Sequence, residues 1–295
     1  LQEALVLELL SSQISAGTLY VVATPIGNLF DMGQRAIAVL SGVDVVAAED
    51  TRHTQKLLTH YGVSAQLVSL HEHNERKRVG ELLARLRNMD SIALVSDAGT
   101  PLVSDPGFLL VERAVREDLP VRAVPGPSAV VAALSVCGLP TDRFVFEGFL
   151  PTRSGARRTH LARCVNESRT LVFFEASRRL PGTLADMVSV FGSGREVSLV
   201  LEISKVYERI SLASVGELCR RLENGEWVCR GECVLIVSGV DHIEAIETDA
   251  DRLVAALTPH LSPRRVAEVA AEIAGGGKNM FYRKALSSES SGRRD

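Results

Sequence analysis

The residues best suited to chemistry stand in two polar clusters, each directly after an apolar run. The first cluster contains Glu49, Asp50, Arg52 and His53 and follows a run that ends at Ala48. A carboxylate in such a place can take a proton from a hydroxyl group, and an arginine can hold a phosphate. A structural role is the alternative, in which Asp50 caps a helix and Arg52 pairs with Glu49, and the two roles can coexist.

The second cluster, His71-Glu72-His73-Asn74, follows an apolar run that ends at Leu70. Two alternating histidines are a possible metal pair, but no third ligand stands at a suitable spacing. We therefore expect no metal site. A polar substrate cleft is the better interpretation, with His71 or Asp50 as the proton acceptor.

Three loops rich in glycine and proline also follow apolar runs. They span 24–28, 95–107 (VSDAGTPLVSDPG) and 125–128. Ligands of open α/β sheets bind beyond the carboxyl ends of the strands, where such loops gather. Asp97 can accept hydrogen bonds there, and Gly99 lets a ligand approach the backbone. Any one loop is open to interpretation as a plain turn, but three together favour a cofactor crevice.

The loops also limit the kind of cofactor. No G-x-G-x-x-G sequence follows a predicted strand, and no Walker sequence occurs. The expected ligand is therefore not NAD or a nucleoside triphosphate held in the usual way.

Arginines cluster between Glu147 and Glu167 without an intervening acidic residue. A run of like charges is most often a solvated face, whereas beside a cleft it suits phosphate groups. A net charge of −3 predicts no general affinity for nucleic acid, so a local patch is needed. The cluster and the basic C-terminal helices together favour nucleic acid; the residues concerned are Arg153, Arg157, Arg158, Arg163, Arg264, Arg265, Lys278, Arg283 and Lys284.

Strands and helices alternate in the first half, which predicts a mostly parallel sheet covered on both faces. We expect strands at 18–23, 43–48, 66–70, 91–96 and 120–124, with helices near 31–41, 52–61, 75–88, 107–117 and after Ser128. A second α/β or α+β domain is expected with strands near 143–147, 170–175, 195–201, 206–212 and 232–238 and helices near 155–166, 178–190 and 214–223. The short connection after 195–201 predicts an antiparallel pair with 206–212.

These patterns divide the chain into five parts. They are an N-terminal extension (1–17), a first α/β domain (18–140), a second (141–241), a small helical C-terminal domain (249–286) and a disordered tail (287–295). Ser262-Pro263 is a typical helix start within the small domain, which has the pattern of a helix-turn-helix hairpin.

Composition excludes several classes of protein. Apolar residues make up 46% and charged residues 23%, as in a globular enzyme. No apolar run reaches the roughly 20 residues of a membrane span. The five cysteines form no C-x-x-C pair, which favours free thiols in a reducing cytosol and therefore a cytoplasmic location.

Six ordered motifs closely resemble the bacterial 16S ribosomal RNA cytidine 2′-O-methyltransferase family, within the tetrapyrrole-methylase superfamily. They are TLYVVATPIGNL, AAEDTRHT, HEHNE, VSDAGTPLVSDPG, PGPSAV and GLPTDRFVFEGFLP. The resemblance covers about residues 18–241 and extends to the small C-terminal domain. It implies two α/β domains of the tetrapyrrole-methylase type with S-adenosylmethionine between them, and a decoding-centre cytidine in 16S rRNA or the small ribosomal subunit as acceptor. Analogy with the superfamily implies a homodimer.

The resemblance also implies roles for particular residues. The donor site would comprise Pro25, Asp97, Gly99, Thr100, Leu102, Val103, Ser128, Ala129, Phe174, Leu201, Glu202, Gly231 and Glu232. The expected RNA contacts are Arg52, His53, Asn74, Arg153, Arg157 and Arg158.

A ribose hydroxyl is a poor nucleophile until its proton is accepted, so a base must reach it. Our candidates are Asp50 and His71, with Glu49 and Glu147 behind them. Two departures concern the second-domain wall: Glu175-Ala176-Ser177-Arg178-Arg179 stands where the family has E-S-P-H-R, and Leu201-Glu202-Ile203-Ser204-Lys205 where it has R-E-L-T-K. Two rivals remain at this point: a methylase of precorrin-like tetrapyrroles, and an RNA-binding protein without catalysis.

Overall fold

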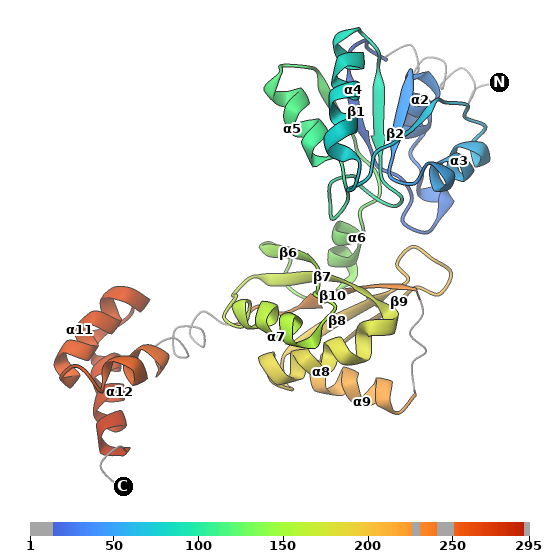
Figure 1. Cartoon of the computed structure of the whole chain (residues 1–295). Helices are drawn as coiled ribbons and strands as arrows, with labels where there is room; N and C mark the ends of the chain where they lie inside the picture. Colours follow the sequence, from blue (N-terminus) through green and yellow to red (C-terminus); the bar gives the residue numbers. More distant parts are fainter. Residues whose placement is uncertain (1–13, 226–230, 241–250, 292–295) are drawn as a thin grey trace.

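The computed structural model describes residues 14–225, 231–240 and 251–291, and its first domain is a doubly covered parallel sheet (Figure 1). Its strands are β1 (Leu19–Val22), β2 (Val45–Ala48), β3 (Leu67–Ser69), β4 (Ile92–Val95) and β5 (Val121–Val124), in the order β3-β2-β4-β1-β5. All pairings are parallel. Every residue of β2 and β4 is buried, as expected for a sheet covered on both faces. The five predicted strands are confirmed.

Helices cover both faces of this sheet. On one face lie α2 (Gln34–Gly42) and α3 (Thr51–His60), which share a hydrophobic core with the side chains of Tyr20 and Val22. On the other lie α4 (Glu75–Arg87) and α5 (Phe108–Arg116), packed around Leu19 and Ile92. A short turn of helix, η1 (Leu29–Asp31), follows β1.

Helix α6 (Ala129–Val136) joins the first domain to a second, mixed sheet. Its strands are β6 (Phe144–Phe149), β7 (Thr170–Ala176), β8 (Glu196–Leu201), β9 (Arg209–Ser214) and β10 (Glu232–Val237), in the order β6-β7-β10-β8-β9. Only β6 and β7 are parallel; β8 and β9 form the predicted antiparallel pair.

The two faces of the second sheet have different partners. One face packs on α7 (Ser154–Arg163), α8 (Leu180–Phe191), which η2 (Ser177–Arg179) precedes, and α9 (Val215–Glu223). The other face packs on α6 through Val172, Val200, Val234 and Ile236 and looks toward the first domain. The crevice between the domains therefore has the carboxyl ends of one sheet on one side and the face of another sheet on the other.

The C-terminal helices have a core of their own. Residues 251–257 are helical, and α11 (Pro263–Ala274) and α12 (Lys278–Ser291) follow. Val254, Val266 and Phe281 are among the buried side chains of this small core. Helix α12 extends to Ser291, into the predicted disordered tail (287–295), and no glycine or proline interrupts it before Gly292. Residues 292–295 and most of the predicted extension, 1–13, lie outside the described residues.

In the part of the chain that the structure describes, no helix is both long and apolar enough to cross a membrane.

One arginine of the predicted RNA-binding cluster lies inside the second domain. Arg157 is 5% exposed, and its guanidinium pairs with Asp186 at 2.6 Å and also donates to the backbone carbonyl of Thr152. Ser154 donates a further hydrogen bond to Asp186 at 2.8 Å. The prediction that Arg157 contacts RNA is therefore wrong, because a buried carboxylate already holds its charge.

We expect Arg157→Ala to lower the free energy of unfolding by about 3–5 kcal/mol, since it leaves Asp186 buried and uncompensated. The matched control is Arg158→Ala, whose side chain is 54% exposed and should change stability by less than about 1 kcal/mol. Urea denaturation followed by circular dichroism measures both. Equal effects of the two substitutions would contradict this assignment.

Candidate active site

The loops at the carboxyl ends of the first sheet are tied together by hydrogen bonds. Thr24 and Gly99 exchange two backbone hydrogen bonds of 2.9 and 3.0 Å, which join the loops after β1 and β4. The Thr100 hydroxyl donates to the carbonyl of Pro127 at 3.0 Å, and the Asp50 amide donates to the Asp97 carboxylate at 3.1 Å. The loops after β2 and β5 are thus joined to the same centre. The predicted convergence of these loops is confirmed.

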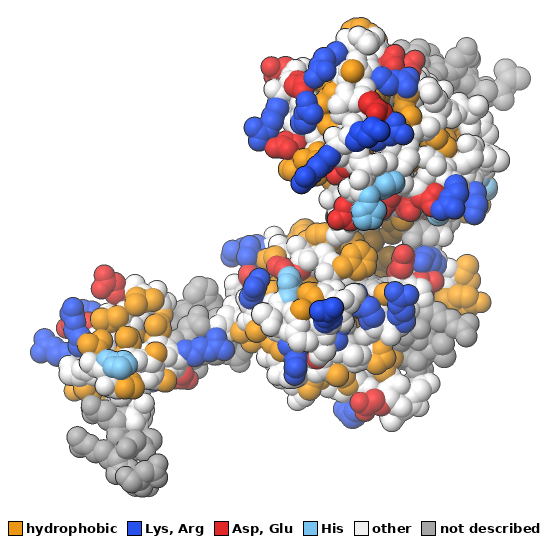
Figure 2. Space-filling model, in the orientation of Figure 1, with side chains coloured by type: hydrophobic (Ala, Val, Ile, Leu, Met, Phe, Trp, Pro, Cys, Tyr) orange, Lys and Arg blue, Asp and Glu red, His pale blue; other side chains and the backbone are white. Residues whose placement is uncertain are grey.

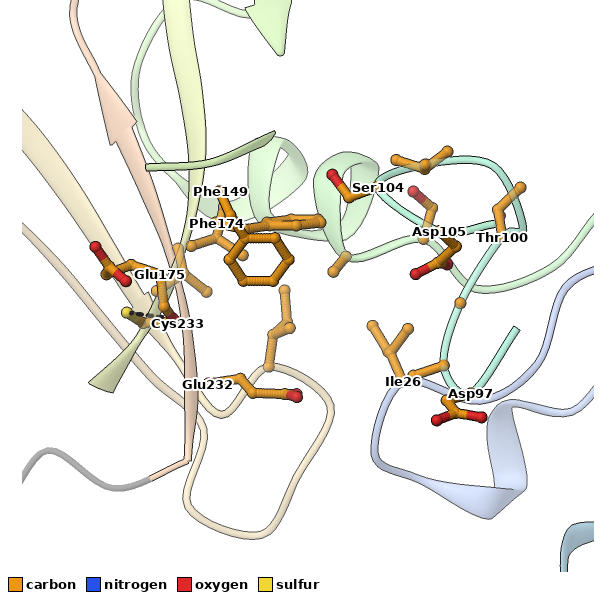
Figure 3. A pocket seen from close by; sticks show the side chains of 18 of the residues that line it. Ile26, Asp97, Thr100, Ser104, Asp105, Phe149, Phe174, Glu175, Glu232 and Cys233 are labelled. Atoms are coloured by element: carbon orange, nitrogen blue, oxygen red, sulfur yellow. Dashed lines mark hydrogen bonds between the residues drawn. The ribbon is translucent and has the colours of Figure 1, made fainter. Parts of the chain in front are cut away.

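A cavity of about 340 Å³ opens between this edge and the second sheet (Figure 3). Its size lies within the range of small-molecule sites. Nine of the predicted donor-site residues line it: Asp97, Gly99, Thr100, Val103, Ser128, Ala129, Phe174, Glu202 and Glu232. Lining residues that the sequence analysis did not single out include Ile26, Asp105, Phe149, Val200 and Lys205.

Three carboxylates on the first-domain side of the cavity influence one another. Burial, opposed by a hydrogen bond with Ser96 and reinforced by the charges of Glu49 and Asp97, raises the pKa of Asp105 to about 6. Burial and the Asp97 charge likewise raise the pKa of Glu49. Such a group of partly buried carboxylates favours either a bound proton or a bound cation.

The second-domain wall of the cavity is apolar and partly aromatic. Phe174 packs edge-on against Phe146 and Phe149, with ring centroids 4.9 and 5.4 Å apart. Val200 and Val234 continue this wall. Figure 2 shows acidic and histidine side chains of the first domain facing hydrophobic side chains of the second where the domains meet. A ligand with a flat ring at one end and a positive charge at the other fits these surfaces.

A loop of the second domain closes one end of the cavity. Lys205 pairs with Glu202 at 2.9 Å and with Glu232 at 3.3 Å. Its aliphatic part lies so close to Gly27 that a Cβ there would clash with it. The neighbouring Ser204 hydroxyl donates a hydrogen bond to Asp31. This loop therefore joins the second domain to the first loop of the first domain.

The Glu175–Arg179 motif on the second-domain wall keeps the first and last residues of the family pattern, and these two residues contact each other. Glu175 is 1% exposed and pairs with Arg179, which also donates to the carbonyl of Leu150; Thr183 donates to the same carboxylate. The glutamate and the final arginine of the motif thus form an ion pair whose carboxylate is buried and whose guanidinium is partly exposed, whereas Arg178, at the histidine position, is exposed.

Four predicted donor-site residues do not line the cavity, namely Pro25, Leu102, Leu201 and Gly231. For Leu201 the reason is strand alternation: its side chain packs into the core beneath α8, while those of Val200 and Glu202 face the cavity. Pro25 and Leu102 lie in the turns beside the cavity; Leu102 has a φ of +76°.

Two of the four candidate bases are poorly placed. Asp50 caps α3 and pairs with Arg52 at 3.1 Å, and hydrogen bonds from Arg52 lower its pKa to about 2. Such a carboxylate is a weak base. Glu147 lies on the face of the second sheet opposite the cavity, so its prediction as a base for the crevice is wrong.

The other two candidates remain near the crevice. Glu49 lines the cavity, and His71 lies close enough to influence the Glu49 carboxyl group electrostatically. His71 itself does not line the cavity, and its Nδ1 is buried without a hydrogen-bond partner.

The predicted RNA contacts also separate into two groups. Arg52, His53, Arg153 and Arg158 are exposed. Asn74 is half-buried and its amide is used internally: it accepts from the His71 amide at 2.9 Å and donates to Ser69 at 3.2 Å. These bonds hold the turn that carries His71, and an RNA contact by Asn74 stays a prediction. In the C-terminal helices Arg264, Arg265 and Lys284 pair with acidic neighbours, which weakens the predicted basic surface.

Comparison with known proteins identifies the domains. Residues 18–219 match the family model of tetrapyrrole (corrin/porphyrin) methylases, and residues 244–289 match that of the RsmI C-terminal HTH domain. Among solved structures, diphthine synthase has a TM-score of 0.56 at 12% identity and covers 78% of this chain and 93% of its own. A uroporphyrin-III C-methyl transferase from Thermus thermophilus, complexed with S-adenyl homocysteine, has a TM-score of 0.51 at 19% identity over 78% of this chain and 99% of its own. These two likenesses concern the fold.

Curated relatives are much more similar in sequence. The chain is 48% identical over 276 residues to ribosomal RNA small subunit methyltransferase I of Pseudomonas aeruginosa, which covers 92% of this chain and 98% of the relative. It is also 48% identical over 277 residues to the protein of that name from Escherichia coli O157:H7, with 94% and 97% covered. The chain therefore belongs to the ribosomal RNA small subunit methyltransferase I family, whose members are methyltransferases built on the tetrapyrrole methylase fold.

Proposed function

We propose that this chain transfers a methyl group from S-adenosylmethionine to the ribose 2′-hydroxyl of a cytidine in the decoding centre of 16S rRNA. The observation that carries the proposal is the cavity between the domains, which places a group of carboxylates opposite an aromatic wall. Family membership supports the reaction class. Because the acceptor is ribosomal RNA, we also assign the chain to the cytoplasm.

The residues of the cavity fit S-adenosylmethionine. Phe174, Phe149 and Val200 offer a flat apolar surface for the adenine ring. Asp97, Glu49 and Asp105 offer negative charge to the sulfonium and ammonium groups. Gly99, at a φ of +84°, turns the backbone where the loop meets Ile26 and leaves room for close approach. When bound, this cofactor supplies an activated methyl group; the chain holds it and orients the acceptor.

We assign the proton-accepting role to Asp105. It lines the cavity, and its raised pKa of about 6 makes it a stronger base than an ordinary carboxylate while leaving it ionised at neutral pH. Asp50, held by Arg52, cannot compete. Glu49 and His71 lie next along the same edge, and the exposed Arg52 and His53 at the start of α3 are placed to hold the RNA backbone.

The acceptor is tested with S-adenosylmethionine that carries a radioactive methyl group. The full chain and this donor are incubated separately with small ribosomal subunits that lack this methylation, with naked 16S rRNA and with a porphyrinoid. We expect label in RNA, recovered after alkaline hydrolysis as a dinucleotide, because a methylated 2′-hydroxyl cannot attack the neighbouring phosphate. Label released as a mononucleotide would point to base methylation instead.

Two further outcomes of this experiment distinguish the rivals. Label found only in the porphyrinoid would establish a tetrapyrrole methylase. An absence of donor binding in calorimetry, together with retained RNA binding, would establish a non-catalytic RNA-binding protein.

The base is tested by the pH dependence of methyl transfer. An acid with a raised pKa is protonated and inactive below that pKa, so kcat/KM should rise with pH through about 6 to a plateau. The positively charged donor, once bound, favours the ionised Asp105 carboxylate. The rise of kcat with pH, which reports the enzyme with its substrates bound, should therefore lie at lower pH than the rise of kcat/KM.

Asp105→Asn should reduce kcat by about 100-fold or more and abolish the limb near pH 6. Asp50→Asn should keep the fall in kcat/KM below about pH 6, because the carboxyl group that it removes has a pKa of about 2. His71→Ala is measured under the same conditions. Donor affinity, measured by calorimetry, separates a loss of base from a loss of cofactor. A limb that survives in Asp105→Asn but disappears in His71→Ala would transfer the role to His71.

We further propose that the chain forms a homodimer through the surface next to α6. Val131 and Val136 on α6 and Ile210 and Leu212 on β9 are exposed. The two β9 residues lie on the α6 face of the sheet, opposite Val200 and Ser198. Since β9 is an edge strand of the described sheet, a second copy would cover both this apolar surface and the free strand edge.

We expect the native chain to elute with the mass of a dimer in size-exclusion chromatography with light scattering, and Ile210→Asp to elute as a monomer. A charge buried in the interface without a partner accounts for the loss. The control is Val115→Asp, a more exposed apolar position on α5 that should leave the mass unchanged. A native chain of monomer mass would refute the dimer.

A further inference from the structure

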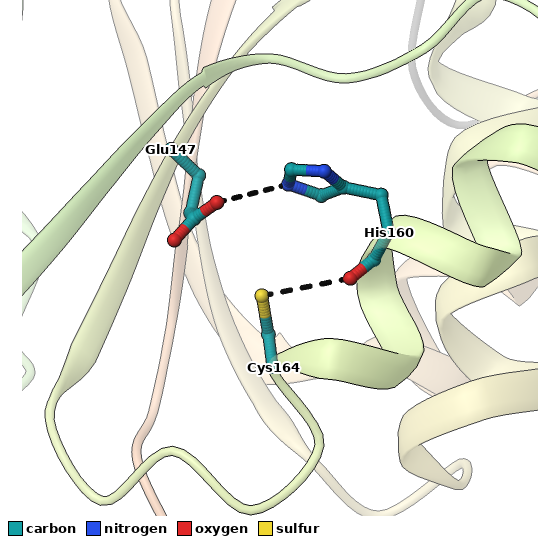
Figure 4. Close-up of side chains that lie close together, drawn as sticks. All are labelled: Glu147, His160 and Cys164. Atoms are coloured by element: carbon teal, nitrogen blue, oxygen red, sulfur yellow. Dashed lines mark hydrogen bonds and ion pairs between the residues drawn. The ribbon is translucent and has the colours of Figure 1, made fainter.

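Glu147, His160 and Cys164 form a cluster between β6 and the end of α7 (Figure 4). Helix α7 packs on the face of the second sheet opposite the one that lines the cavity. One ligand atom of each lies within 4.8 Å of the others. His160 and Cys164 stand four residues apart at the end of α7, so they share one side of the helix, and Glu147 on β6 faces that side.

The glutamate continues the alternation of its strand: Val145 packs in the core on the α7 side and Phe146 on the opposite face, so Glu147 lies on the α7 side again. The pairing of β6 with β7 shifts between Phe146 and Gly148, which leaves Glu147 as the additional residue of a bulge. Phe146 and Phe149 on either side both pack against Phe174 at the cavity, whereas the Glu147 carboxylate contacts His160 behind the sheet.

The polar atoms of the cluster are poorly satisfied by one another. His160 Nε2 lies 3.0 Å from Glu147 Oε2, yet this buried nitrogen has no well-directed hydrogen bond. The Cys164 sulfur makes only a long contact of 3.7 Å with the His160 carbonyl. A cation bound between the imidazole nitrogen, the carboxylate and the sulfur would give each of these three groups a partner.

The donor set indicates which cation. Sulfur, imidazole nitrogen and carboxylate oxygen are the three ligand types of zinc, and three protein ligands leave a fourth position for water. A thiolate ligand disfavours magnesium and calcium, which prefer oxygen. Glu147 and His160 are each about one quarter exposed, at 25% and 27%, so an ion and its water have access from solvent. Glu167 is engaged by Arg169 at 2.7 Å and does not complete the set.

We propose that Glu147, His160 and Cys164 bind a zinc ion with water as the fourth ligand, and that this ion fastens α7 to β6. The Cys164 thiol proton passes to solvent as the sulfur–zinc bond forms. The connection held in this way is the β6–α7 loop, which begins at Phe149 on the cavity wall and is already held by Arg179 and Arg157. The site is structural and independent of the proposed methyl transfer.

Cobalt(II) is the probe, because it takes the same tetrahedral sites as zinc and its thiolate complexes absorb light. The full chain, without a histidine tag, is stripped with a chelator, kept reduced with a phosphine and titrated with cobalt. We expect one cobalt per chain, a near-ultraviolet sulfur-to-cobalt band and visible bands typical of tetrahedral cobalt, all displaced by zinc. Zinc should also raise the melting temperature of the stripped chain, since it binds the folded state.

Variants locate the ion. Cys164→Ser should abolish the sulfur band, and Glu147→Gln, which preserves the size of the side chain, should weaken cobalt binding by about 10-fold or more. Cys219→Ser is the matched control: this partly buried cysteine on α9 lies outside the cluster and its substitution should leave the band intact. Circular dichroism of each variant confirms that it is folded.

Three results would overturn the proposal. They are a stripped native chain that gives no sulfur band, a band that persists in Cys164→Ser, and a band that is lost in Cys219→Ser. In the first case Glu147 and His160 form an ion pair only. In the other two the metal is held elsewhere in the chain.

Discussion

The pair of backbone hydrogen bonds between Thr24 and Gly99 is the interaction on which the site depends. A parallel sheet brings the carboxyl ends of its strands to one edge, but loops at that edge are free to diverge. The Thr24–Gly99 pair joins the loops after β1 and β4, and the bonds from Thr100 to Pro127 and from Asp50 to Asp97 add the loops after β5 and β2. The four loops behave as one wall, on which the positions of the carboxylates are fixed.

The two walls of the crevice are built by different physical means. The first domain presents polar loops at strand ends, where carboxylates are partly buried and raise one another's pKa values. The second domain presents the flat face of a sheet, where apolar side chains alternate with those of the core behind it. A polar wall facing an apolar one orients a ligand that has both kinds of surface.

Much of this arrangement was predictable from the sequence, because its signals are local. Short apolar runs followed by Gly/Pro loops predicted the strands, and the rule for ligands of α/β sheets then placed Asp97 and Gly99 at the site.

The second-domain wall of the cavity was harder to predict from the sequence. Which side chain of Val200 and Leu201 faces the cavity depends on a one-residue register that no local signal fixes. The bulge in β6 that brings Phe149 to the cavity side likewise has no local signal. Arg157 was misassigned for a related reason, since its partner Asp186 lies 29 residues away on another helix. Asp105 stands in the very loop that the sequence singled out, but its importance comes from burial beside two other carboxylates, which only the folded chain shows.

The Asp50 cap of α3 has a consequence for how an anionic polymer meets this surface. The carboxylate accepts the Arg52 amide at 2.8 Å and so occupies a free N–H group at the start of the helix, while also repelling negative charge. The helix terminus is therefore closed to phosphodiester oxygens, although such termini often attract them. A phosphodiester that reached this edge would therefore meet the exposed side chains of Arg52 and His53 rather than main-chain N–H groups.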